Sequence, residues 1–110
     1  MDKLSITIPP KKVYIKSVRL FTSGLASEQG FDIEAIEDIK VVVSEAINYK
    51  ISDEPITINF SANEKELEIE VVGKDKTLDE RALTMRDLIL NELADEANIS
   101  EDKIVITKRA

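Results

Sequence analysis

Residues 36–46, which read Ile36-Glu37-Asp38-Ile39-Lys40-Val41-Val42-Val43-Ser44-Glu45-Ala46, decide the fold of this chain. Apolar residues return every three or four positions, as on one side of a helix that turns about 100° per residue. We therefore expect a helix whose buried stripe comprises Ile36, Ile39, Val43 and Ile47. Three acidic residues lie together on another side of the same helix: Glu34, Asp38 and Glu45.

The residues on either side predict where this helix begins and ends. Asp32 is a typical N-cap, and Glu34 follows it in the first turn, where the helix dipole favours negative charge. The turn sequence Ser52-Asp53-Glu54-Pro55 predicts that the helix ends near Ile51.

A strand and a helix are expected before residue 30. Leu4, Ile6 and Ile8 alternate with polar residues, which predicts a short strand, and the two prolines that follow end it because proline cannot donate a ladder hydrogen bond. The next helix should stop at Gly30. Its expected inner stripe is Tyr14, Val18, Phe21 and Leu25, and its opposite side carries Lys12, Lys16 and Arg19.

A hairpin and a third helix are expected after residue 55. Strict alternation over residues 56–62 and 66–71 predicts two strands joined at residues 63–65. Thr77 and Glu80 form a capping box for the next helix, whose inner side should comprise Leu78, Ala82, Met85, Ile89 and Leu93. We expect a loop over residues 98–102 and a last strand that contains Ile104 and Ile106.

The expected order βααββαβ defines an α+β fold, a two-layer α/β sandwich with three helices on one face of a mixed, mainly antiparallel sheet. The chain is short enough for one core, and no Pro/Gly/Ser-rich linker divides it, so residues 1–110 are expected to form a single domain.

The composition excludes several kinds of chemistry. The chain has no cysteine and no histidine, so it lacks thiolate nucleophiles, the usual general base and the commonest transition-metal ligands. Its net charge of −7 disfavours binding to phosphate backbones, so we expect no nucleic-acid partner. The longest apolar run is residues 41–43, and no signal peptide precedes the first strand, so we expect a cytoplasmic protein without a membrane partner.

The order of elements over residues 4–72 and the motif Val43-Ser44-Glu45-Ala46 resemble the anti-sigma-factor serine kinases of the histidine-kinase-like (GHKL) ATPase superfamily. The resemblance implies the Bergerat-like fold of those ATPases and a nucleotide site beside the second helix. It also implies that Glu45 corresponds to the glutamate that polarises the attacking hydroxyl.

This sequence departs from the family pattern at three places. The family has a magnesium-binding asparagine four residues after the glutamate, where this chain has Tyr49, and Asn48 comes one residue early. The aspartate that reads adenine is displaced to Asp75 or lost. The glycine-rich lid that cradles phosphate is missing, since the chain has three glycines and only residues 73–76 separate the hairpin from the capping box. The sequence therefore predicts this fold in a shortened form without its ATP site.

Each candidate residue also has a simpler structural interpretation. Glu45 would belong to a solvated acidic helix face, Asn48 to the end of the helix and Asp75 to the turn before the third helix. The basic side of the first helix is either solvated, docked on an acidic partner, or paired with the acidic face of the second helix.

Three functions follow. The first is a non-catalytic regulatory module that resembles an anti-sigma factor, binds a sigma factor or its antagonist, and needs no cofactor. The second is an active ATP-dependent serine/threonine protein kinase with a minimal lid, in which Glu45 is the base, Asn48 binds Mg²⁺ and Asp75 reads adenine. The third is a structural subunit that dimerises through its helices. We expect the first, with a homodimer as one state of the molecule.

Overall fold

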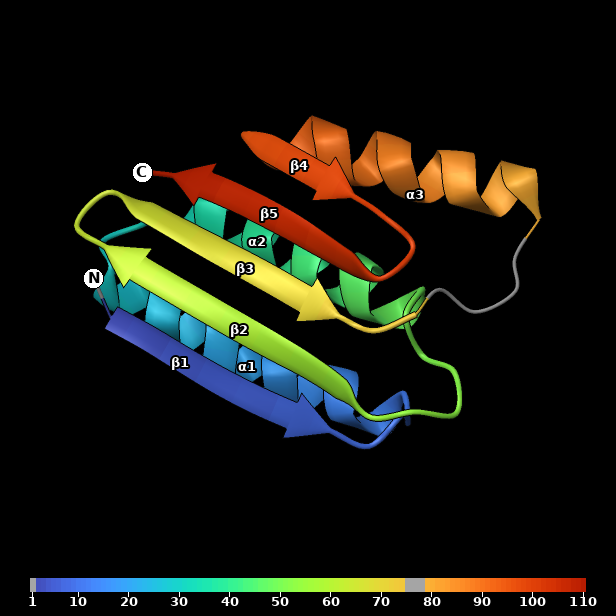
Figure 1. Cartoon of the computed structure of the whole chain (residues 1–110). Helices are drawn as coiled ribbons and strands as arrows, with labels where there is room; N and C mark the ends of the chain where they lie inside the picture. The colour runs from blue at the N-terminus through green and yellow to red at the C-terminus, as the bar shows by residue number, and fades with distance from the viewer. Residues whose placement is uncertain (1, 75–78) are drawn as a thin grey trace.

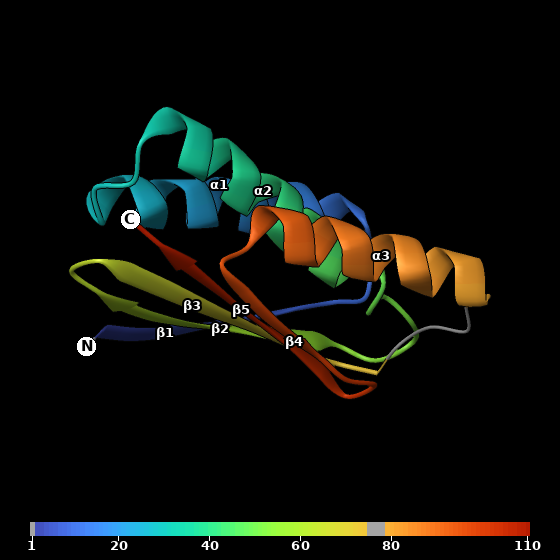
Figure 2. The same cartoon turned by 90° about the horizontal axis from the view of Figure 1, so that it is seen from above.

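The computed structural model describes residues 2–74 and 79–110, and it has three helices packed on one face of a five-stranded sheet (Figures 1 and 2). The elements follow in the order β1 (Asp2–Ile8), α1 (Val13–Glu28), α2 (Ile33–Asn48), β2 (Ile56–Asn63), β3 (Glu66–Val72), α3 (Glu80–Leu93), β4 (Glu96–Ile99) and β5 (Lys103–Arg109).

The sheet has the strand order β1-β2-β3-β5-β4, and all four pairings between the described strands are antiparallel. The expected two-layer α+β architecture is thus confirmed, but the sheet is antiparallel throughout its described part rather than mixed. Residue 63 pairs with residue 66, so the β2–β3 hairpin turns at the place that the sequence predicts.

Strand β4 is the element that the sequence analysis missed. Residues 96–99 pair with residues 104–107 of β5, although residues 98–102 were expected to form a loop. Four residues are too few to show a period-two pattern that stands out, and only Ala97 and Ile99 are apolar on the inner side. Arg109 holds this edge strand from β5, because its guanidinium lies 3.1 Å from Glu96 and 3.4 Å from Glu66 of β3.

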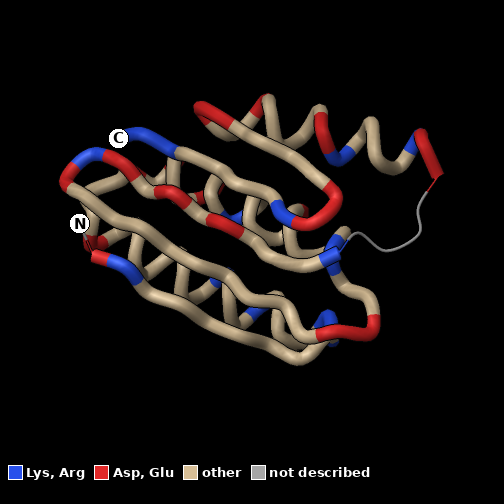
Figure 3. The backbone as a smooth tube through the Cα atoms, in the orientation of Figure 1, with Lys and Arg blue, Asp and Glu red and all other residues tan. Residues whose placement is uncertain are grey.

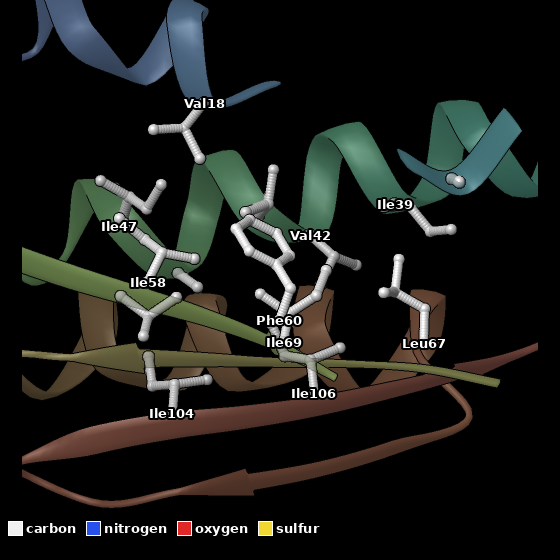
Figure 4. Packing of buried hydrophobic residues seen from close by; sticks show 14 of the residues in the cluster. Val18, Ile39, Val42, Ile47, Ile58, Phe60, Leu67, Ile69, Ile104 and Ile106 are labelled. Atoms are coloured by element: carbon white, nitrogen blue, oxygen red, sulfur yellow. The ribbon is translucent and has the colours of Figure 1, made fainter. Parts of the chain in front are cut away.

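The core lies between the sheet and helix α2, the central helix of the layer (Figure 4). Ile39, Val43 and Ile47 are buried as expected, while Ile36 is partly buried. The sheet contributes alternate residues from its three inner strands, among them Ile58, Phe60, Leu67, Ile69, Ile104 and Ile106. Asp32 caps α2 as predicted, since its carboxylate accepts a hydrogen bond of 2.8 Å from the backbone N–H of Ala35.

The buried side of α1 differs from the expected stripe. Val18 is buried, but Tyr14 and Phe21 remain 38% and 37% exposed, and the buried residues beside Val18 are Thr22 and Ala26. Helix α1 lies behind β1 and β2 (Figure 1), and the ring of Phe21 packs on Phe60 of β2 with the two centroids 5.3 Å apart. Thr22 can be buried because its hydroxyl donates to the carbonyl of Val18 at 2.7 Å.

The inner side of α3 also differs from the prediction. Arg86 and Leu90 are buried, Ala82, Ile89 and Leu93 are half-buried, and Met85 is 53% exposed. Asp79 caps the helix by accepting a 2.8 Å hydrogen bond from the N–H of Ala82. The predicted capping residue Thr77 and the predicted inner residue Leu78 lie outside the described residues.

The outer face of the sheet is polar. One row of hydrogen bonds crosses its strands: Ser5 donates to Asn59 at 2.8 Å, Asn59 donates to Glu70 at 2.9 Å, and Lys103 approaches Glu70 at 3.5 Å. This face therefore contributes an ordered polar surface, while the residues expected to carry chemistry lie on the helix side.

Candidate functional site

The candidate site is the side of α2 that faces α3. Near the middle of α2, Asp38 lies 3.7 Å from the ammonium of Lys108, and the same ammonium donates to the carbonyl of Leu93 at the end of α3. At the C-terminal end of α2, the guanidinium of Arg86 lies 5.9 Å from the ring centroid of Tyr49. The two helices are therefore antiparallel along this seam: Lys108 of β5 links Asp38 of α2 to the end of α3, and Arg86 of α3 contacts the residue that follows α2.

Glu45 lies along this seam. It follows Asp38 by seven residues and precedes Tyr49 by four, so all three side chains leave α2 on nearly the same side. Glu45 is half-buried, Asp38 is ion-paired and Glu34 is exposed. The three acidic residues thus do not form one uniformly solvated face.

Arg86 closes the seam next to Tyr49. Only 4% of this residue is exposed, and its Nε lies 3.0 Å from a carboxylate oxygen of Asp87. A guanidinium within about 6 Å of a ring face is attracted by the ring quadrupole, more strongly where water is excluded. Tyr49, which occupies the offset of the family's magnesium ligand, is therefore packed against α3.

Lys50 fixes the backbone just beyond α2. The residue is 0% exposed, and its ammonium donates two hydrogen bonds of 2.8 Å to the carbonyls of Ser100 and Glu101. The turn between β4 and β5 is thereby held against the end of α2. Gly73 lies next to Lys50 and bonds to the same turn, because its N–H donates to the carbonyl of Asp102 at 2.9 Å. A Cβ atom at Gly73 would lie 3.6 Å from the Cβ of Lys50.

The structure brings two of the three predicted site residues close together. Glu45 is within α2, Asn48 is the last residue of that helix and is half-buried, and Asp75 lies outside the described residues. The resemblance implies an amide oxygen for Mg²⁺ one position after Asn48, where this chain has the phenol of Tyr49 under Arg86. These residues do not fit the magnesium–nucleotide site that the resemblance implies.

Sequence reasoning missed Lys50 and Arg86. A buried lysine has no signature in a single sequence, since lysine is almost always exposed. The position of Arg86 could have been inferred from spacing. It precedes Leu90 by four residues, so the two side chains lie on one side of the helix, and both are buried.

Two surface hollows lie away from this seam. One, of about 420 Å³, is on the outer face of the sheet and is lined by residues of β1, β2 and β3. The other, of about 630 Å³, runs along α3 and is lined by residues 79–81, 84, 85 and 88. Neither lining includes Glu45 or Asn48.

The described helices include none that is long and apolar enough to cross a membrane. Among residues 2–74 and 79–110, no group of three or more acidic side chains is arranged to hold a metal ion.

Comparison with known proteins identifies relatives of this chain. No family model matches the sequence. Proteins named serine-protein kinase RsbW from Listeria innocua and Oceanobacillus iheyensis are 38% and 36% identical to it over 85 residues, which cover 71% of this chain and 54% of each relative. The corresponding protein of Bacillus pumilus is 34% identical over 88 residues.

A solved structure shows the same fold. The crystal structure of the RsbU and RsbW domains of Rv1364c from Mycobacterium tuberculosis superposes with a TM-score of 0.78 at 20% identity, covering 99% of this chain and 32% of that one. The chain spans about half the length of the curated relatives that it matches. Over 71% of its length the chain is therefore similar to proteins named serine-protein kinase RsbW, and it has the histidine-kinase-like fold that residues 36–46 led us to expect.

Proposed function

We propose that this chain is a non-catalytic regulatory module that binds a protein partner and does not bind ATP. The observation that carries the proposal is the contact of Arg86 with Tyr49, which packs the end of α2 against α3 at the position of the family's magnesium ligand. An Mg²⁺ ion at the family's usual position would meet the half-buried ring of Tyr49 and the buried Arg86 there.

The connection between β3 and α3 supports the same interpretation. The chain passes from Val72 to Glu80 through residues 73–79, with one glycine at its start. Gly73 itself is committed to the Lys50 cluster through its bond to Asp102. Phosphoryl transfer depends on positioning and on neutralising phosphate charge, so a seam without a glycine-rich phosphate cradle favours recognition over catalysis.

The proposed partner is a sigma factor or the protein that antagonises such a regulator. This part of the proposal rests on the homology to RsbW proteins and on the family resemblance. Its test is a binding measurement between the purified chain and the sigma factors and their antagonists from the same organism. Saturable one-to-one binding to one of them supports the proposal, and absence of binding to all of them contradicts it.

An active serine/threonine protein kinase is the second candidate, because the relatives are named serine-protein kinases and Glu45 is retained on α2. In that case Glu45 would act as the base, and Asn48 and Asp75 would serve Mg²⁺ and adenine.

Thermal unfolding with and without Mg·ATP separates the two candidates. A ligand at 100 times its Kd stabilises the folded state by ~2.7 kcal/mol, which raises the melting temperature of a domain this small by ~10–20 °C. We expect no shift at millimolar Mg·ATP, and Mg·GTP serves as the matched control. A shift with Mg·ATP alone that disappears in the variant Asn48→Ala would establish an ATP site and overturn the proposal.

A further inference from the structure

Helix α3 has an outer side that none of the described elements covers. The helix lies at the edge of the helix layer (Figures 1 and 2), and the side that carries the buried residues Arg86 and Leu90 faces the core. On the outer side, Met85 is 53% exposed and Leu88 is 61% exposed. Neighbouring apolar side chains that stay exposed on a folded domain can mark an interaction surface.

Two hollows lie on this outer side, and Leu88 lines both of them. The first has a volume of about 630 Å³ and is also lined by Asp79, Glu80, Arg81, Thr84 and Met85. The second has a volume of about 390 Å³ and is also lined by Ile89, Glu92 and Leu93. The two sets of lining residues are centred about seven to eight residues apart, which is about 11 Å along a helix that rises 1.5 Å per residue.

This spacing fits the side chains of another helix. Side chains seven residues apart lie on the same side of an α-helix and are about 10.5 Å apart along its axis. In an extended strand, the side chains on one face recur every ~6.8 Å, so no two of them are about 11 Å apart. A helix aligned with α3 can therefore place one apolar side chain in each hollow, and an extended peptide cannot.

Carboxylates flank both hollows. Asp79 and Glu80 line the first and Glu92 lines the second, whereas Arg81 is the single cation among the described residues that line them. Glu80 and Glu92 are exposed, and neither forms an ion pair within residues 2–74 and 79–110. A partner with basic side chains beside its apolar stripe is complementary to these charges, and an acidic partner is repelled by them.

We propose that the outer side of α3 binds an amphipathic helix of a partner protein, with two apolar side chains of that helix in the hollows and lysine or arginine beside Glu80 and Glu92. The inference rests on the proposed protein-binding function, and it names the surface that is used and the chemistry of the partner. Helix α3 has 14 residues. Such a helix is only about 21 Å long, so the contact is small and we expect reversible binding in the micromolar range.

A synthetic peptide tests the proposal on the full chain. The peptide is about 18 residues long, with leucines spaced as on one side of a helix and lysines on the flanking positions, and its control has glutamate in place of lysine. Fluorescence anisotropy should show saturable binding of the lysine peptide to the wild type and no binding of the glutamate peptide. The proposal is overturned if the lysine peptide does not bind saturably at protein concentrations up to about 1 mM.

Leu88→Glu separates the apolar contact from simple attraction between net charges. The variant adds one negative charge, so binding through net charge alone should become tighter, whereas loss of the apolar contact should weaken it by about tenfold or more. Leu20→Glu on α1 is the matched control, because its leucine is 64% exposed and the change of charge is the same. Circular dichroism establishes that both variants remain folded, and equal affinities of the two variants for the peptide would overturn the proposal.

Glu92→Lys tests the basic character of the partner. It should weaken binding of the lysine peptide by about threefold to tenfold, because it replaces a carboxylate of the second hollow by an ammonium. Glu68→Lys makes the same change of charge at an exposed position on β3, and it should change the affinity by about twofold or less. Equal effects of the two variants would assign the binding to net charge and contradict the proposed surface.

Two further measurements identify the occupant. A sigma factor or antagonist whose binding is unchanged by Leu88→Glu would overturn this surface and leave the proposed function standing. Peptide binding that Leu88→Glu weakens, in a chain that binds none of those proteins, would support the surface and count only against the proposed function. Self-association in sedimentation velocity that Leu88→Glu abolishes and that excludes the peptide would assign the surface to a second copy and overturn the proposal.

Discussion

Lys50 shows how one side chain can hold two distant parts of this fold together. Its ammonium bonds to two carbonyls of the β4–β5 turn, and the residue is fully buried at the end of α2. Hydrogen bonds from a charged donor are stronger than those between neutral groups. Removing the donor also leaves the two buried carbonyl acceptors without a partner, which costs stability.

We expect Lys50→Met to lower the free energy of unfolding by about 1–3 kcal/mol, because methionine keeps the packed stem but removes both hydrogen bonds. Urea unfolding followed by circular dichroism measures the change. Lys16→Met on the exposed side of α1 is the control and should change stability by about 0.5 kcal/mol or less. Equal stability of the Lys50 and Lys16 variants would show that the two bonds have no net effect.

Helix α1 contains one glycine and is followed closely by another, and we expect these two to respond oppositely to alanine. Gly30 has φ +84°, where an L side chain is strained, so Gly30→Ala should destabilise the protein by about 1–2 kcal/mol. Gly24 lies inside α1 with open space around its missing Cβ, so Gly24→Ala should stabilise it by about 0.5–1 kcal/mol. Both changes are read from urea midpoints, and a loss of stability at Gly24 would contradict this account of α1.

At the scale of elements, the sequence predicted well whatever depends on local periodicity. Helix α2, its cap at Asp32 and the β2–β3 hairpin are as expected, because strong patterns and turn residues act within one segment. The predicted set of buried residues on α3 was partly wrong, because the side that becomes buried depends on the positions of α2 and of the sheet edge. Strand β4 was missed because its pairing with β5 decides its conformation.

The candidate site was predicted only in part for the same reason. The position of Glu45 on a helix followed from spacing, but its placement beside α3 depends on tertiary contacts such as that of Lys108 with Asp38. No pattern in the sequence indicates that Arg86 covers Tyr49, since residues so far apart are brought together only by the folded chain.

At the scale of the whole molecule, net charge should govern the response to salt. The chain carries a net charge of −7, and Figure 3 shows acidic residues along β3 and α3. Added salt screens the mutual repulsion of these groups, so we expect the melting temperature to rise between low and physiological ionic strength. A gain of about 1 kcal/mol would appear as ~4–8 °C.

Glu68→Lys provides the control for this salt dependence. Glu68 is exposed on β3, and its replacement by lysine reduces the net negative charge by two. The rise with salt should therefore be smaller in this variant, as measured by differential scanning calorimetry. A melting temperature that falls with salt in the wild type would mean that attractive pairs such as Arg109 with Glu96 outweigh the repulsion.

The alternating glutamates of β3 have a consequence for the chain while the ribosome is still making it. Strand β3 pairs on one side with β2, which precedes it directly, but its other neighbour β5 is separated from it by residues 73–102. Until β5 has been translated, the backbone N–H and C=O groups on that edge of β3 are unpaired and can bond to another nascent strand. The strand then carries a row of negative charges from Glu66, Glu68 and Glu70, which disfavours pairing of this edge with another chain.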